Sequence, residues 1–322
     1  YLHSATMVKA GVFLMARFYP VMAGTEAWFV AVSLTGMATM LLGAYIALFR
    51  HDLKGLLAYS TVSHLGLITL LLGLGTDLAA VAAVFHIINH AVFKASLFMA
   101  AGIIDHESGT RDMRKLNGLW KYMPWTATLA MVAASSMAGV PLLNGFLSKE
   151  MLFSETLHQD TLGALSWWIP LLATAGGALA VAYSLRFMHD VFFNGEPIDL
   201  PRTPHEPPRY MRVPVEVLVV LCLLVGTFPQ FMVGTLLSTA AGAVLLGNLP
   251  EYSLAIWHGF NLPLLMSAVA VLGGGILYLN RRHLFEFQMQ FVDRDAKYVF
   301  EDLVQRFIGR VTLLHRWLDD GS

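Results

Sequence analysis

Three side chains that can gain or lose a proton recur at regular spacing inside a long apolar segment. His86, His90 and Lys94 stand at i, i+4 and i+8, which places them along one face of a helix with a drift of only ~40° per step. A charge deep in a membrane helix costs roughly 2.5–3.5 kcal/mol on insertion scales, so such groups usually serve a function there. The spacing therefore predicts a path for protons.

Two other interpretations of this segment remain open. Histidines at i, i+4 can chelate zinc, as in H-E-x-x-H, but no Glu follows His86, no third ligand stands nearby, and Lys94 would repel a cation one turn away. We therefore predict no metal site and no cofactor. Alternatively, His86 and His90 satisfy each other in the core of a helix bundle, which leaves Lys94 without a role.

Lys9 and His64 are the other ionisable groups inside apolar runs. Lys9 lies in the middle of its run, six residues after His3, which favours a function over a side chain that reaches to an interface. His64 has hydroxyl side chains around it in sequence, so a relay role and a structural hydrogen bond between helices are equally open. Histidine titrates near neutrality, and an amine taken out of water can release its proton when a neighbouring charge changes.

Composition places these residues in a membrane. Hydrophobic residues make up 56% of the 322-residue chain, charged residues make up 13%, and the mean hydropathy is +0.60. Apolar runs, most of which reach the ~20 residues that a spanning helix needs, lie at residues 28–49, 53–74, 79–104, 124–157, 166–192, 213–228 and 260–279. The runs are continuous rather than alternating, and a helix pairs its backbone groups internally. We expect an all-α, polytopic bundle of transmembrane helices.

The run at residues 124–157 is long enough to need a break. Gly139, Pro141 and Gly145 mark its position, because proline removes a backbone donor and glycine loosens the chain. Two half-helices would then face each other, with helix termini at membrane depth where they can bind ions. Lys149 stands about two turns beyond Pro141, on the second half.

Basic residues cluster in every second connection between the predicted spans. They are Arg50 and Lys54; Arg111, Arg114, Lys115 and Lys121; Arg186, Arg202, Arg209 and Arg212; and Arg281 with Arg282. This alternation places the basic loops in the cytoplasm. It requires residues 124–157 to cross once and residues 231–247 not to cross. The net charge of −1 argues against a nucleic-acid partner, and the single Cys222 can form no disulfide within the chain.

The predicted organisation has four parts. Residues 1–192 form the main transmembrane bundle, 193–214 a proline-rich cytoplasmic loop, 215–280 further transmembrane helices, and 281–322 an amphipathic helix at a surface. In the last part an apolar stripe over residues 292–318 separates from charged positions. The chain begins inside an apolar helix expected over residues 1–18, so we expect it to be a piece of a longer protein.

Four motifs in order resemble the antiporter-like subunits of respiratory complex I and of Mrp-type cation/proton antiporters. They are LHSATMVKAG at 2–11, DLKGLLAYSTVSHLG at 52–66, HIINHAVFK at 86–94 and GFLSKE at 145–150. Within that family, IIDHESGTRD at 103–112 and NGL at 117–119 look most like the large A subunit of the Mrp Na⁺/H⁺ antiporter. Family members carry an earlier inverted repeat, so residues 1–192 would be the second half of an antiporter-like fold.

The resemblance implies roles for the ionisable residues. Lys9 would be the central-axis lysine and Lys149 the site near the exit, with His3 gating the relay. The connecting relay would comprise His64, His86, His90 and Lys94.

The resemblance also implies a function. The chain would belong to a proton-translocating subunit of a multisubunit Na⁺/H⁺ antiporter in the bacterial cytoplasmic membrane. It would not be an enzyme. Its partners would be other subunits, which the tail helix would contact, together with the lipid bilayer, H⁺ and a monovalent cation. Two alternatives remain: a proton-pumping subunit of NADH-quinone oxidoreductase or a membrane-bound hydrogenase, and a scaffold whose polar residues only hold helices together.

Overall fold

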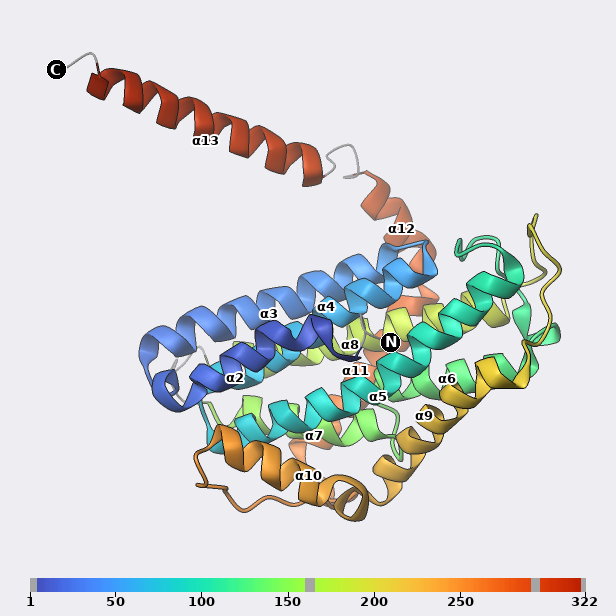
Figure 1. Cartoon of the computed structure of the whole chain (residues 1–322), viewed down its shortest axis with the longest axis horizontal. Helices are drawn as coiled ribbons and strands as arrows, with labels where there is room; N and C mark the ends of the chain where they lie inside the picture. Colours follow the sequence, from blue (N-terminus) through green and yellow to red (C-terminus); the bar gives the residue numbers. More distant parts are fainter. Residues whose placement is uncertain (1–4, 160–165, 291–295, 320–322) are drawn as a thin grey trace. The chain divides into compact units, whose positions relative to one another are not determined.

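The computed structural model describes residues 5–159, 166–290 and 296–319, which form helices joined by loops (Figure 1). The chain divides into two compact units, residues 1–278 and 279–322. The first unit holds η1 (Met7–Lys9), α2 (Ala10–Met22), α3 (Glu26–Phe49), α4 (Leu53–Leu74), α5 (Asp77–Ser108), η2 (Leu119–Lys121), α6 (Pro124–Ala138), α7 (Asn144–Leu157), α8 (Trp168–Phe192), α9 (Arg209–Thr227), α10 (Pro229–Val244) and nearly all of α11 (Leu262–Leu279). The second unit holds α12 (Arg281–Met289) and α13 (Ala296–Asp319).

Among the described residues, six helices are long and apolar enough to cross a membrane: α3, α4, α5, α8, α9 and α11. The expected all-α, polytopic architecture is confirmed. The helix boundaries follow local sequence signals. The side chains of Thr25, Asp52 and Thr76 cap α3, α4 and α5 by accepting a hydrogen bond from a backbone N–H of the first turn. Gly75 and Gly109 end α4 and α5 in the left-handed conformation.

The predicted break is present between α6 and α7. Gly139 follows α6 with φ +88°, a conformation that glycine adopts at no steric cost, and Leu142 is also left-handed with φ 70°. Pro141 lies in this connection. Gly145, in the first turn of α7, packs so closely on the backbone of Ser136 that a Cβ atom would collide with the carbonyl oxygen. The two half-helices therefore meet at a close backbone contact.

The basic loops gather at one end of the bundle, as the alternation of charge predicts. Residues 50–53 and 111–113 pair through backbone hydrogen bonds, and residues 193–208 contact the same region, for instance through Ile198 N and Lys115 O at 3.0 Å. We call this the basic end. At the opposite end, the Thr76 hydroxyl donates to Glu155 Oε2 at 2.7 Å, which joins the start of α5 to the last turn of α7.

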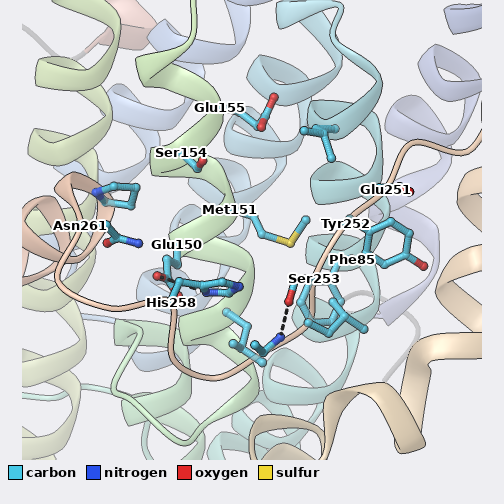
Figure 2. Close-up of a pocket in the computed structure, with 15 residues that line it drawn as sticks. Phe85, Glu150, Met151, Ser154, Glu155, Glu251, Tyr252, Ser253, His258 and Asn261 are labelled. Atoms are coloured by element: carbon cyan, nitrogen blue, oxygen red, sulfur yellow. Dashed lines mark hydrogen bonds and ion pairs between the residues drawn. The ribbon is translucent and has the colours of Figure 1, made fainter.

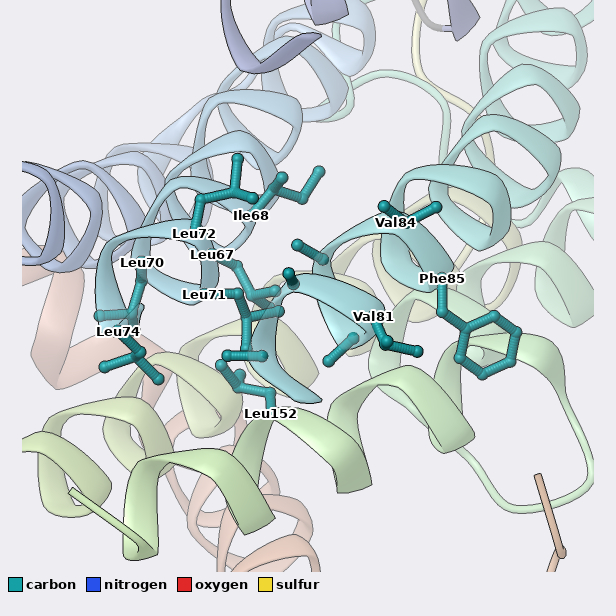
Figure 3. Close-up of a cluster of buried hydrophobic side chains, with 14 of the residues drawn as sticks. Leu67, Ile68, Leu70, Leu71, Leu72, Leu74, Val81, Val84, Phe85 and Leu152 are labelled. Carbon is teal, nitrogen blue, oxygen red and sulfur yellow. The ribbon is translucent and has the colours of Figure 1, made fainter. Parts of the chain in front are cut away.

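Two clusters of buried apolar side chains fill the bundle. One lies toward the opposite end and includes residues 67–74 of α4, 79–85 of α5 and Leu152 of α7 (Figure 3). The other lies toward the basic end and includes Leu53–Leu57 of α4 and Phe93–Ile104 of α5. Between these clusters, α4 and α5 bury seven polar side chains, so a polar layer lies at mid-depth: Ser60, Thr61, Ser63, His64, His86, Asn89 and His90.

Several boundaries differ from the expectations. The first described element is the 3₁₀ turn at Met7–Lys9, and α2 follows it to Met22, whereas a helix is predicted over residues 1–18, of which residues 1–4 lie outside the described residues. α9 begins at Arg209, inside the stretch predicted as loop. The described part of the tail contains α12 and α13 rather than one helix, and the predicted stripe begins at residue 292, outside the described residues.

The segment after α9 packs on a different part of the bundle from α9. The buried residues of α9 lie mainly in the basic-end cluster, whereas those of α10 lie in the other cluster. α10 therefore packs beside the other cluster, and it is not among the six candidate spans of the described residues. That residues 231–247 do not cross stays a prediction. Gly226, near the end of α9, packs against the backbone of Leu142 and Leu143, so the junction of α9 and α10 lies beside the break between α6 and α7.

Candidate functional site

The polar layer is formed by neighbouring helices that bring histidines together. His64 of α4 and His86 and His90 of α5 are all buried, with 2, 0 and 0% of their surface exposed. The ring centroid of His64 lies 5.2 Å from each of the other two rings. The tertiary structure thus places His64 against the helix face that carries the histidine ladder.

Direct hydrogen bonds join four side chains from four helices into one chain. The Tyr183 hydroxyl of α8 lies 3.2 Å from His64 Nε2, and His64 Nδ1 lies 3.0 Å from His86 Nε2. His86 Nδ1 then lies 2.8 Å from Ser148 Oγ of α7. Each of these groups can act as donor and as acceptor, so a proton taken up at one ring nitrogen can be released from the other. The chain of bonds can pass a proton between α8 and α7.

His90 is close to this chain of bonds but is not part of it. Neither of its ring nitrogens has a hydrogen-bond partner among the described residues. Its centroid is 6.2 Å from that of His86. His86 and His90 therefore do not satisfy each other, which was one interpretation of their spacing. His86 is instead satisfied by His64 and Ser148.

The three buried lysines are held by oxygen atoms without charge. Lys94, fully buried, donates to Leu57 O at 3.3 Å and to the Ser60 hydroxyl. Lys9 donates to Ala5 O at 3.0 Å. In the part of the chain that the structure describes, neither amine forms a hydrogen bond with a histidine.

Lys149 forms hydrogen bonds at the break between α6 and α7. Its ammonium nitrogen donates to Met137 O at 2.7 Å and to Ala138 O at 2.9 Å. These are terminal carbonyls of α6, which have no partner within their own helix and attract a cation. Gly139 is needed beside them, because a Cβ atom there would lie 2.8 Å from Cδ of Lys149. The expected meeting of an ionisable group with a half-helix terminus is therefore present.

Two members of the bonded chain and one lysine partner were not predicted from the sequence. Tyr183 stands in an apolar run of α8, where a buried phenol hydroxyl needs a hydrogen-bond partner. This need for a partner is the one feature of the sequence that could have indicated a role for Tyr183 in a hydrogen-bonded chain. Ser148 stands next to Lys149, and Ser60 stands one turn before His64. His3, expected to gate the relay, lies outside the described residues. Within the described residues, no group of three or more His, Cys, Asp or Glu is arranged to hold a metal ion.

Known proteins are similar to this chain in sequence. The family profile described as NADH:quinone oxidoreductase/Mrp antiporter, TM, matches residues 1–175. The chain is 65% identical over 285 residues to a probable A/B subunit of a K⁺/H⁺ antiporter from Rhizobium meliloti, covering 88% of this chain and 28% of that protein. It is 44% identical over 302 residues to the A subunit of the Na⁺/H⁺ antiporter of Bacillus subtilis, covering 87% of this chain and 38% of that protein.

A solved structure is similar as well. The Mrp complex from Dietzia sp. DQ12-45-1b contains a chain that matches with a TM-score of 0.84 and 37% identity, covering 95% of this chain and 33% of that one. The present chain thus spans less than half the length of the relatives that it matches. Because the family profile covers more than half of the residues and the fold agrees, this membrane protein belongs to the family of transmembrane antiporter-like subunits that NADH:quinone oxidoreductases and Mrp antiporters share.

Proposed function

We propose that this chain is the second half of a proton-translocating subunit in a multisubunit monovalent-cation/proton antiporter of the bacterial cytoplasmic membrane. The observation that carries the proposal is the bonded chain Tyr183, His64, His86 and Ser148, which ends beside Lys149 at the helix break. The names of the similar antiporter subunits from Rhizobium meliloti and Bacillus subtilis support it.

The proposed mechanism assigns a role to each group. Lys94 and Lys149 hold protons on the two sides of the polar layer. Lys9 holds a proton in the 3₁₀ turn η1. His64 and His86 pass protons between them by taking one up at one nitrogen and releasing one from the other. His90 is an additional proton acceptor in the same layer, because neither of its ring nitrogens has a hydrogen-bond partner among the described residues. These groups hold and move protons and transform no substrate, so the proposed role is transport rather than enzyme catalysis.

The exchanged cation is proposed to be Na⁺ or K⁺. The relative with 65% identity is named for K⁺ and the one with 44% identity is named for Na⁺. A redox-driven proton pump is the second candidate, because the family profile includes subunits of NADH:quinone oxidoreductase. Such a pump would use the same relay but would depend on electron transfer in partner subunits.

The test compares two histidines of one helix in the full-length protein within its assembled complex. His86→Leu removes a group bonded on both sides, whereas His90→Leu removes one without a bonded partner among the described residues. We expect proton-gradient-driven Na⁺ or K⁺ transport in vesicles to fall at least roughly 100-fold for His86→Leu, the usual scale for losing a proton-transfer group, and considerably less for His90→Leu.

Assembly is followed on native gels in parallel. Transport that falls only in proportion to assembly for both variants would favour the scaffold alternative. Equal loss of transport in two intact complexes would contradict the assigned order of the relay. Proton movement that needs electron transfer and neither Na⁺ nor K⁺ would favour the redox-driven pump.

A further inference from the structure

A cavity of about 300 Å³ lies at the opposite end of the bundle, away from the basic loops. The start of α5, residues 147–155 of α7 and the segment before α11 line it (Figure 2). Three of its lining residues are acidic, namely Glu150, Glu155 and Glu251, and no Lys or Arg is among the described residues that line it. The described lining side chains that can carry a charge near neutral pH are thus three carboxyls and the imidazole of His258.

Glu150 is a buried carboxylate that lacks sufficient partners. Only 7% of the residue is exposed, and its Oε2 atom has no hydrogen-bond partner among the described residues. The nearest basic group, His258 Nδ1, lies 3.7 Å from Oε1. Figure 2 shows the two side chains together at the cavity wall. Because a buried carboxylate without donors is costly, this group needs a positive partner.

The remaining lining supplies oxygen ligands. Glu155 accepts a hydrogen bond from Thr76 at 2.7 Å, which fixes its carboxylate, and Ser154, Ser253 and Asn261 bring neutral oxygens. Oxygen ligands of this kind suit hard cations. No group of three or more acidic or histidine side chains in the described chain is arranged to coordinate a metal ion tightly. The volume leaves room for a cation that keeps several waters, each of which takes ~30 Å³ in the liquid.

We propose that this cavity binds a partly hydrated alkali-metal cation, with Glu150 as the principal ligand. The inference deepens the proposed function and rests on it in one respect, since the cation would be one of the two exchanged ions. Glu150 follows Lys149 on α7, about 100° around the helix. Lys149 faces the end of α6 and Glu150 faces the cavity. A cation bound at Glu150 would repel the ammonium form of its neighbour, so cation binding and proton retention would oppose each other.

Equilibrium binding of ²²Na⁺ and ⁸⁶Rb⁺ to the purified full-length complex tests the site. We expect Glu150→Gln to weaken binding of one of these ions about tenfold, the order of one missing charge at close range in a partly solvated site. Glu251→Gln, whose side chain is exposed at the cavity rim, should weaken it less. Glu26→Gln is the matched control, because Glu26 is an exposed carboxylate in the first turn of α3 that does not line the cavity. Unchanged binding in Glu150→Gln would overturn the proposal.

A labelling experiment keeps the proposal testable if Glu150→Gln fails to assemble. Ser253→Cys places a thiol at the cavity, while the native Cys222 is fully buried. Na⁺ or K⁺, but not choline, should slow modification of this thiol by a cationic thiol reagent. An unchanged rate, or protection by Ca²⁺ or Mg²⁺ alone, would overturn the alkali-cation site.

The two proposals fail in different ways. Lost cation binding in Glu150→Gln together with no antiport in the wild-type complex would support the site and contradict the proposed function. Normal antiport in the wild-type complex, together with cation binding that no cavity variant changes, would support the proposed function and contradict the cation site.

Discussion

The lysines inside the bundle and the cationic side chains at the basic end have different partners. Lys94 and Lys149 donate to carbonyls and a hydroxyl. At the basic end, Lys54 lies 2.6 Å from Asp105, and Arg114 lies 2.6 Å from an oxygen of the neighbouring Asp112. Among the described residues, the buried lysines form no ion pair with a carboxylate.

We call a charge fixed where an ion pair with a carboxylate holds it. We call it adjustable where the group has only uncharged oxygen partners and can change its protonation state. A carboxylate holds its partner in the charged form, and hydrogen bonding from Arg114 in turn lowers the pKa of Asp112. A carbonyl or hydroxyl oxygen, by contrast, accepts a hydrogen bond from an ammonium and from a neutral amine alike. The cations at the basic end are therefore held in their charged form, whereas the oxygen partners of the interior amines can accept a hydrogen bond in either protonation state.

The largest expected effect comes from removing an adjustable charge. Lys149→Met should lower proton-coupled cation transport at least roughly 100-fold while the complex still assembles, because methionine fills similar space and no buried carboxylate loses its partner. Vesicle transport and native gels measure the two properties. Lys54→Met is the matched control, since its partly exposed pair with Asp105 contributes about 1 kcal/mol or less. Equal loss of transport in both variants would remove the distinction between the two groups of cations.

A second change converts an adjustable charge into a fixed one. Ser60→Asp places a carboxylate beside Lys94, which should hold the amine in its charged form. We expect transport to fall about tenfold or more, the order expected for a new charge pair at close range. Ser60→Asn has nearly the same size without the charge and should be affected much less. Similar transport in the two variants would mean that Lys94 does not change protonation during turnover.

The third change breaks a fixed pair that is buried. Arg186 of α8 is 3% exposed and donates to Asp190 at 3.2 Å and to Leu48 O. Arg186→Leu should lower the free energy of unfolding by about 3 kcal/mol at most, because the largely buried Asp190 carboxylate loses the Arg186 guanidinium and keeps the hydrogen bond from Tyr278. Thermal unfolding of the detergent-solubilised complex measures this. Adding Asp190→Asn should recover part of the loss, and a double variant that is no more stable would contradict the pairing.

The smallest expected effect is a dependence on pH at the basic end. Burial lowers the pKa of His51, and Arg186 and Arg114 lower it further. The unfolded chain therefore binds a proton at His51 more readily than the folded chain, so stability should decline as the pH falls below about 6.5. His51→Gln should flatten the dependence of the melting temperature between about pH 7 and 5. An unchanged slope would assign the dependence to other groups.

The sequence predicts the helices well where the signal is local. The predicted span at residues 53–74 coincides with α4, and the break follows from Gly139 and Pro141. It is less successful where the signal depends on packing. Hydropathy along the chain does not predict the 3₁₀ turn at Met7–Lys9 or the packing of α9 and α10 on different parts of the bundle.

The same limit applies to the site. The i, i+4 spacing indicated that His86 and His90 share a helix face, but helix rotation and neighbouring helices decided which of the two is bonded within the described residues: His86 is, and His90 is not. Tyr183 was missed because nothing within α8 indicates which helix its hydroxyl contacts. The roles of these residues in transport stay predictions.

The sequence by itself determined the membrane setting, the spans, the broken helix and the set of ionisable groups within the bundle. These follow from costs that act along the chain, such as burying a charge or interrupting a backbone hydrogen bond. Only the tertiary structure decided the partners: His64 against His86, Lys149 against the end of α6, and Glu150 against a cavity. Hydrogen bonds and charge pairs between helices depend on distances of a few ångströms that no spacing along one helix specifies.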